Sequence, residues 1–151
     1  MTTAAAHPPS APTDLDGALA RIREHGGRVT AAKRSVLGRL YAPGPPRTAE
    51  ELADELAGID RSVVYRCLAQ LEELGIAEHV HLGHGQAVYR RRGLQTVPVA
   101  CQVCGASAEL DRAATDAFSA VVRERTGIDL DLVHFPLLGR CARCADADPS
   151  S

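Results

Sequence analysis

The sequence predicts an α+β fold in two parts, an N-terminal winged helix followed by a small α/β unit, and three observations support this. Residues 14–74 place apolar side chains at helical spacing, interrupted by glycine and proline. From residue 76 the apolar spacing alternates, which is typical of strands. Two Cys-x-x-Cys pairs follow in the last third of the chain, where they can tie a small unit together.

Four short helices are expected in the first part. The first ends at Gly26-Gly27, and Thr30 can cap a second helix that stops before a Pro-Gly-Pro-Pro run. Thr48 and Glu51 form a capping box that opens a third helix. Asp60 can cap a fourth helix, which runs to about residue 74 and is closed by a glycine.

Strands complete both parts. Segments 76–82 and 86–90 flank Gly83-His84-Gly85 and predict a β-hairpin, and helices followed by a hairpin are the pattern of a winged helix. The second part is expected to contain strands at 97–101 and 106–110, a helix at about 113–125 and a last strand at 128–138.

Composition shifts set the expected boundaries. They are a disordered arm at 1–13, a winged-helix domain at 14–92, a linker at 93–97, an α/β domain at 98–144 and a disordered tail at 145–151. The arm is small and Pro-rich, without the basic start of a signal peptide, and no apolar run is long enough to span a membrane. We therefore expect a cytoplasmic protein with no membrane partner.

The cysteine pairs are the most specific motif. Cys101 and Cys104 form one pair, Cys141 and Cys144 form the other, and 36 residues separate them. Each pair can hold zinc from a tight turn, and together they complete a tetrahedral site with no open position. The sequence predicts one structural zinc per chain. The alternative is two disulfides, which are rare in the reducing cytosol.

The fourth predicted helix has two distinct faces. Its apolar stripe, expected in the core, is Val64, Cys67, Leu68, Leu71 and Leu74. Cys67 is therefore expected to be a small core side chain rather than a redox sensor. The opposite face presents groups that could reach base edges in a major groove, namely Arg61, Ser62, Tyr65 and Arg66. The alternative is a solvated charged face on which Tyr65 packs.

Other cations are placed to contact the phosphates of double-stranded DNA. Arg28 lies before the second helix, and Arg90-Arg91-Arg92 follow the hairpin. The net charge of the chain is −2, so no global positive field indicates nucleic acid. The prediction of DNA binding therefore depends on local placement of these groups.

The predicted hairpin is rich in histidine. His79 and His81 would point to one face of a strand, His84 lies in the turn, and Glu78 precedes them. Imidazoles with a carboxylate suit zinc, nickel, cobalt or ferrous iron, so a second divalent metal site is one interpretation. The other is that these polar residues decorate a solvent-facing hairpin or contact DNA.

No motif points to an enzyme. Zinc held by four cysteines leaves no coordination position for water. The chain has no Gly-x-Ser-x-Gly, no phosphate-binding Gly-rich loop and no His-Glu-x-x-His. We expect no catalytic residues and no small-molecule substrate.

The order of the motifs resembles the ferric uptake regulator family over about residues 15–144. The matching segments are Gly27-Arg28-Val29-Thr30, Thr48-Ala49-Glu50-Glu51-Leu52, Val64-Tyr65-Arg66-Cys67-Leu68, Ala87-Val88-Tyr89 and the two cysteine pairs. The resemblance implies a dimeric, metal-responsive transcription regulator, usually a repressor, that binds an inverted-repeat operator. It also implies that Tyr65 contacts bases, that Arg66 contacts a base or a phosphate, and that the four cysteines hold structural zinc.

Several positions depart from the family pattern. Members usually carry a His-rich run before the first cysteine pair, whereas residues 94–100 contain no histidine. Pro46 stands where a sensor histidine is usual, and Arg92 stands where zinc-sensing members often have a cysteine. Glu24 stands where relatives have a basic residue that probes the minor groove. We therefore expect the scaffold to be kept and metal sensing to be altered or lost.

Two functions fit these observations. The first is a homodimeric DNA-binding repressor stabilised by structural zinc. The alternative is a zinc-stapled dimerisation or adaptor protein that pairs with a related regulator and no longer binds operators on its own. Glu24 and the near-neutral first half of the chain motivate this alternative.

Overall fold

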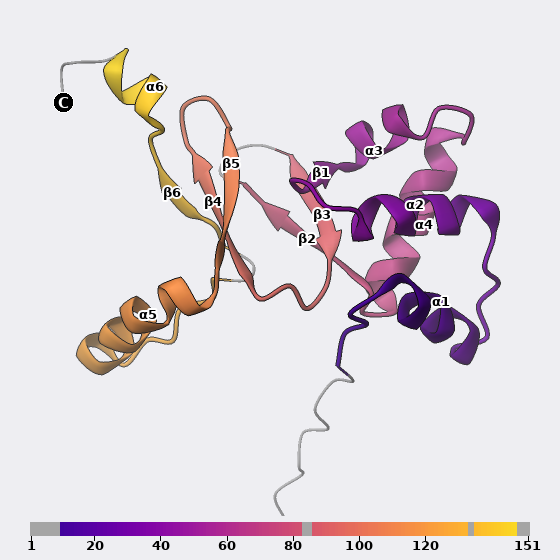
Figure 1. The fold of residues 1–151 in the computed structure, drawn as a ribbon, viewed down its shortest axis with the longest axis horizontal. Coiled ribbons are helices and arrows are strands. Elements are labelled where there is room, and N and C mark those ends of the chain that lie inside the picture. Colours follow the sequence, from indigo (N-terminus) through magenta and orange to yellow (C-terminus); the bar gives the residue numbers. More distant parts are fainter. Residues whose placement is uncertain (1–9, 83–85, 133–134, 148–151) are drawn as a thin grey trace, which may run out of the picture.

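The structure is a computed structural model, and it describes residues 10–82, 86–132 and 135–147 (Figure 1). Its helices are α1 (Leu15–Glu24), α2 (Ala31–Tyr41), α3 (Ala49–Glu55), α4 (Arg61–Glu73), α5 (Ala113–Thr126) and α6 (Ala142–Asp146). Its strands are β1 (Arg47–Thr48), β2 (Ala77–His81), β3 (Ala87–Arg91), β4 (Thr96–Cys101), β5 (Ser107–Asp111) and β6 (Leu137–Gly139). The predicted α+β class is confirmed.

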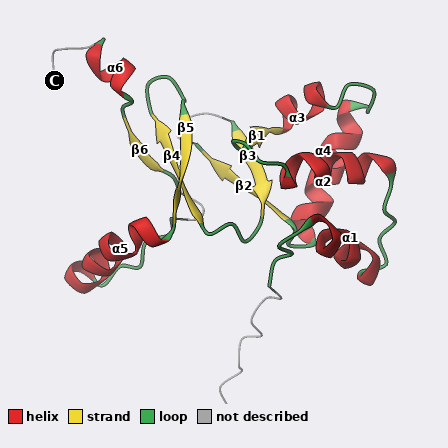
Figure 2. Cartoon of the chain, in the orientation of Figure 1, coloured by secondary structure: helices red, strands yellow, loops and turns green. Residues whose placement is uncertain are grey.

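The first part is a winged helix. Helices α1 to α4 gather at one end of the molecule beside an antiparallel sheet of order β1-β3-β2 (Figure 2). Strands β2 and β3 pair in the register Val80↔Val88, as expected for a hairpin, and the predicted turn at 83–85 lies outside the described residues. The short strand β1, which sequence periodicity did not indicate, adds a third strand on the other side of β3.

The helices form where their caps and apolar stripes predict them. Asp14 accepts a hydrogen bond from the Gly17 backbone N–H at 2.7 Å, and Thr48 and Glu51 form the predicted capping box. One apolar cluster joins all four helices to the start of the sheet. Its fully buried members are Ala18, Ile22, Val36, Leu37, Val64, Leu71 and Ile76. This core fixes α4 with its apolar stripe inward.

The predicted arm does not extend to residue 13. Pro12 is buried, and its carbonyl accepts a hydrogen bond from the Tyr41 hydroxyl at 3.2 Å. The Thr13 carbonyl accepts one from Arg91 at 3.3 Å. The described residues 10–13 therefore lie against the winged helix.

The second part is a three-stranded sheet of order β5-β4-β6, with α5 and α6 at the far end of the molecule (Figure 1). Strand β4 is antiparallel to β5 and parallel to β6. It begins at Thr96, inside the predicted linker. Helix α6 runs to Asp146, so the predicted tail begins inside a helix.

The prediction of a strand at 128–138 is wrong over most of its described length. The observed strand covers only Leu137–Gly139, and residues 128–132 are irregular. The alternating apolar residues of this segment accompany α5 instead of joining the sheet. Asp129 pairs with Arg123 of α5 at 3.2 Å, and Leu132 is buried beside that helix.

In the described part of the chain, no helix combines the length and the apolar character needed to cross a membrane.

Two glycines give opposite stability predictions. Gly75 follows α4 with φ 65°, and its N–H donates to the Glu72 carbonyl at 2.9 Å. Gly75→Ala should lower the free energy of unfolding by about 1–2 kcal/mol, because a side chain is strained in this left-handed conformation. Gly38 lies inside α2, where a Cβ would meet nothing within 4 Å. Gly38→Ala should raise the free energy by about 0.5–1 kcal/mol. Urea denaturation measures both, and a loss of stability in both variants would contradict this account.

Candidate metal centre and nucleic-acid interface

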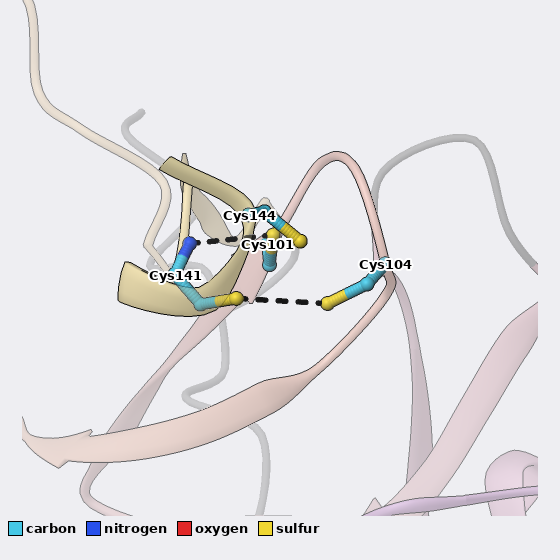
Figure 3. A group of neighbouring side chains, drawn as sticks. All are labelled: Cys101, Cys104, Cys141 and Cys144. Carbon is cyan, nitrogen blue, oxygen red and sulfur yellow. Dashed lines mark hydrogen bonds between the residues drawn. The ribbon is translucent and has the colours of Figure 1, made fainter. Parts of the chain in front are cut away.

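The four predicted zinc ligands converge on one point (Figure 3). Cys101 ends β4, Cys104 follows in the turn, Cys141 caps α6 and Cys144 lies within it. Their sulfur atoms all lie within 4.8 Å of one another, and the Sγ atoms of Cys104 and Cys141 are 3.7 Å apart. Zinc at its usual Zn–S distance of about 2.3 Å spaces four tetrahedral sulfur atoms about 3.8 Å apart. The cluster is therefore close to the dimensions of a four-cysteine zinc site, and one sulfur pair already matches them.

Strand pairing brings together cysteines that are far apart in sequence. Cys101 is the register partner of Gly139, and the Gln102 N–H donates to the Gly139 carbonyl at 2.9 Å. The chain leaving β6 therefore reaches Cys141 directly beside the end of β4. After the first pair, Gly105 adopts φ 74° and donates to the Cys101 carbonyl at 2.9 Å, which closes the turn.

Backbone N–H groups around the cluster favour the thiolate forms of Cys101 and Cys104. The N–H groups of Cys104 and Cys141 lower the pKa of the Cys101 thiol to about 6, and the Ala106 N–H lowers the pKa of Cys104. Hydrogen bonding with the Cys141 and Cys104 side chains raises the pKa of Cys144 to about 12. Neighbouring thiolates repel one another, so the full set of four needs a bound cation. A dication such as zinc supplies that charge.

All five cysteines are free in the structure, so the alternative of two disulfides does not describe it. Cys67 is buried on the inner stripe of α4, as predicted. Burial raises the pKa of its thiol above the ordinary value, which disfavours the reactive thiolate form.

The outer face of α4 is open to solvent. The Tyr65 side chain is 46% exposed, and Ser62 and Arg66 are also exposed. Arg61 is exposed too, but its guanidinium pairs with Glu50 at 3.1 Å and with Asp54 at 2.7 Å, both on α3. A phosphate or base would have to compete with these carboxylates for Arg61.

Arg28 lies at the surface just before α2, where its carbonyl accepts a hydrogen bond from the Lys33 Nζ at 3.1 Å. Arg90, one of the three arginines expected to contact the DNA backbone, is instead buried, with only 3% of its side chain exposed. Sequence reasoning missed this because a run of three arginines normally indicates a solvated segment.

The histidines of β2 lie together, but without their predicted carboxylate. The rings of His79 and His81 share one face of the strand with centroids 5.4 Å apart, and Nδ1 of His79 is hydrogen-bonded to Glu72 of α4. Glu78 points to the other face, where it pairs with Arg90 at 2.9 Å. His84 lies outside the described residues. Within residues 10–82, 86–132 and 135–147, only the four cysteines group three or more metal-binding side chains closely.

Known proteins share both parts of this architecture. A helix-turn-helix domain model matches residues 32–80. The zinc uptake regulation protein of Mycobacterium tuberculosis is 29% identical over 125 residues, covering 79% of this chain and 95% of that protein. The peroxide-responsive repressor PerR of Staphylococcus aureus is 20% identical over 137 residues, covering 88% and 93%. The Helicobacter pylori ferric uptake regulator Fur has the same fold, with a TM-score of 0.68 at 20% identity over 87% of this chain and 93% of that one.

The chain is therefore similar, in sequence and in fold, to regulators of the ferric uptake regulator family. The helix-turn-helix match points to DNA binding, and the cysteine cluster points to metal binding. The curated relatives are regulators, in agreement with the prediction that the chain is not an enzyme. This likeness accounts for a helix-turn-helix and a cysteine cluster in one chain.

The cysteine cluster gives a prediction about metal content. The purified protein should hold one zinc ion per chain, and Cys104→Ser should lose it because three thiolates no longer complete the tetrahedron. Cys67→Ala is the matched control, since Cys67 lies in the winged-helix core and not in the cluster. Elemental analysis of dialysed protein measures both variants. Full zinc content in Cys104→Ser, or its loss in Cys67→Ala, would contradict the assigned ligands.

Proposed function

We propose that the protein is a homodimeric repressor that binds an inverted-repeat operator through the outer face of α4 and is stabilised by one structural zinc. The observation that carries the proposal is the two-sided character of α4. Its apolar stripe is buried, while Tyr65 and Arg66 stand exposed on a helix inside the helix-turn-helix match. An aromatic ring and a guanidinium on such a helix suit contacts with base edges and phosphates.

Exposed apolar side chains support self-association through the second part. They lie on β5, on α5, on the segment after α5 and on β6, and they are Leu110, Phe118, Val121, Ile128, Phe135 and Leu138. Each is at least 42% exposed in the single chain. A second copy could cover such a surface, and twofold symmetry would present two α4 helices to the two halves of an inverted repeat.

We also propose that the wing is not a metal sensor in this protein. The Helicobacter pylori ferric uptake regulator Fur has three functional metal-binding sites. In this chain Glu78 pairs with Arg90, and His79 is bonded to Glu72. A metal bound there would have to displace at least one of these contacts.

DNA binding should depend on Tyr65 and Arg66. We expect Arg66→Ala to weaken operator binding by about 1–3 kcal/mol and Tyr65→Ala to weaken it similarly, because each variant loses a direct contact. Arg61→Ala should cost less, since Glu50 and Asp54 already occupy its guanidinium. Fluorescence anisotropy on an operator selected from random duplexes measures each variant at several salt concentrations.

Arg125→Ala on α5 removes the same charge from an exposed position remote from α4 and is the control. If Tyr65→Ala and Arg66→Ala both bind the operator like the parent, α4 is not the helix that contacts it. If the pure parent protein binds no duplex but forms heterodimers with a related regulator, the adaptor function replaces the proposed one.

Metal titration tests the wing separately. Zn²⁺, Fe²⁺ or Mn²⁺ added to protein that already holds its structural zinc should leave operator affinity unchanged. The His79→Ala/His81→Ala double variant should behave in the same way. An affinity change in the parent that the double variant loses would instead make the wing histidines a regulatory metal site.

A further inference from the structure

Arg90 is a buried cation between the two parts of the molecule. It lies on β3, and 3% of its side chain is exposed. Its Nε donates to Glu78 of β2 at 2.9 Å, and its Nη1 donates to Glu109 of β5 at 3.1 Å. Nη1 also lies 3.4 Å from the Thr96 hydroxyl at the start of β4. One guanidinium therefore contacts both sheets.

Arg90 supplies a polar contact between two sheets from different parts of the chain. A cavity of about 310 Å³ lies beside Arg90, and residues of both parts line it, including Arg47, Tyr89, Leu94 and Glu109. The polar contacts of Arg90 therefore lie beside a hollow that both parts line.

We propose that Arg90 is a permanent clamp between the winged helix and the second sheet, filling an acidic site that Glu78 and Glu109 would otherwise offer to a divalent cation. The two carboxylates come from strands that share no sheet, so without a cation between them they would repel one another. The planar guanidinium donates from different nitrogens in fixed directions, which a point charge does not. Its positive charge is covalently attached, so the connection does not depend on metal concentration.

Glu109→Gln gives the cleanest test, because it leaves the Arg90–Glu78 pair inside the winged helix intact. ¹⁵N relaxation of the zinc-loaded full chain without DNA measures whether the two parts tumble together. The parent should show one correlation time for both. In Glu109→Gln the winged helix should tumble faster than the second part. Asp111→Asn is the control, since it makes the same change at an exposed position on the same strand.

Two arginine variants extend the test. Arg90→Lys should release the second sheet, because one ammonium cannot reproduce the guanidinium fork, while Arg91→Lys should behave like the parent. Arg90→Ala should uncouple the parts until Ca²⁺ is added, because Glu78 and Glu109 can then bind the ion through their oxygen atoms. Circular dichroism checks that each variant is folded. If Arg90→Ala does not fold, the result for Glu109→Gln alone decides whether the proposal stands.

Unchanged tumbling in Glu109→Gln would overturn the proposal, as would an equal release in Asp111→Asn. A Ca²⁺ response in the parent would show that the acidic site is not filled. Since all measurements are made without DNA, their outcome is separate from whether α4 reads an operator.

Discussion

The contact between β4 and the chain leaving β6, closed by four cysteine sulfurs, is the constraint on which the second part depends. The winged helix has a continuous apolar cluster, but the second part buries little. Of α5, all of which is described, only Thr115 is buried. Small units with so little core usually need a metal, a disulfide or a partner chain to remain folded. Metal binding and folding of this part are therefore expected to be one event.

The same shortage of core explains the exposed surface of the second part. Phe118 and Val121 stand on one side of α5, and Ile128 and Phe135 follow it, each largely open to solvent in the single chain. Zinc at the cysteine cluster would hold the ends of β4 and β6 together beside α6, at the opposite end of the second part from α5 (Figure 1). Bound zinc and a second copy of the chain would thus stabilise different regions of this poorly packed part.

Local signals predicted much of the fold and the cysteine cluster. Caps such as Thr30 and Thr48 and the inner stripe of α4 depend on residues close in sequence, so the sequence shows them directly. The failures come from interactions between distant segments. Residues 128–132 have the alternating pattern of a strand but lie beside α5. The sequence around Arg90 predicts a solvated arginine, and only the fold places Glu109 of β5 next to it. Likewise, Glu72 reaches His79 from α4, while the adjacent Glu78 faces the opposite side.

Charge is used differently in the two parts of this protein. If the four cysteines hold zinc as thiolates, they need a cation that the chain does not contain, and folding of the second part would be linked to metal supply. Glu78 and Glu109 face a cation that the chain does contain, so their contact is independent of that supply. A ligand changes a conformational equilibrium only by its difference in affinity between the two states. If Arg90 clamps the two parts as proposed, both carboxylates at the interface are already paired, a metal would gain little there, and the orientation of the winged helix follows from folding itself.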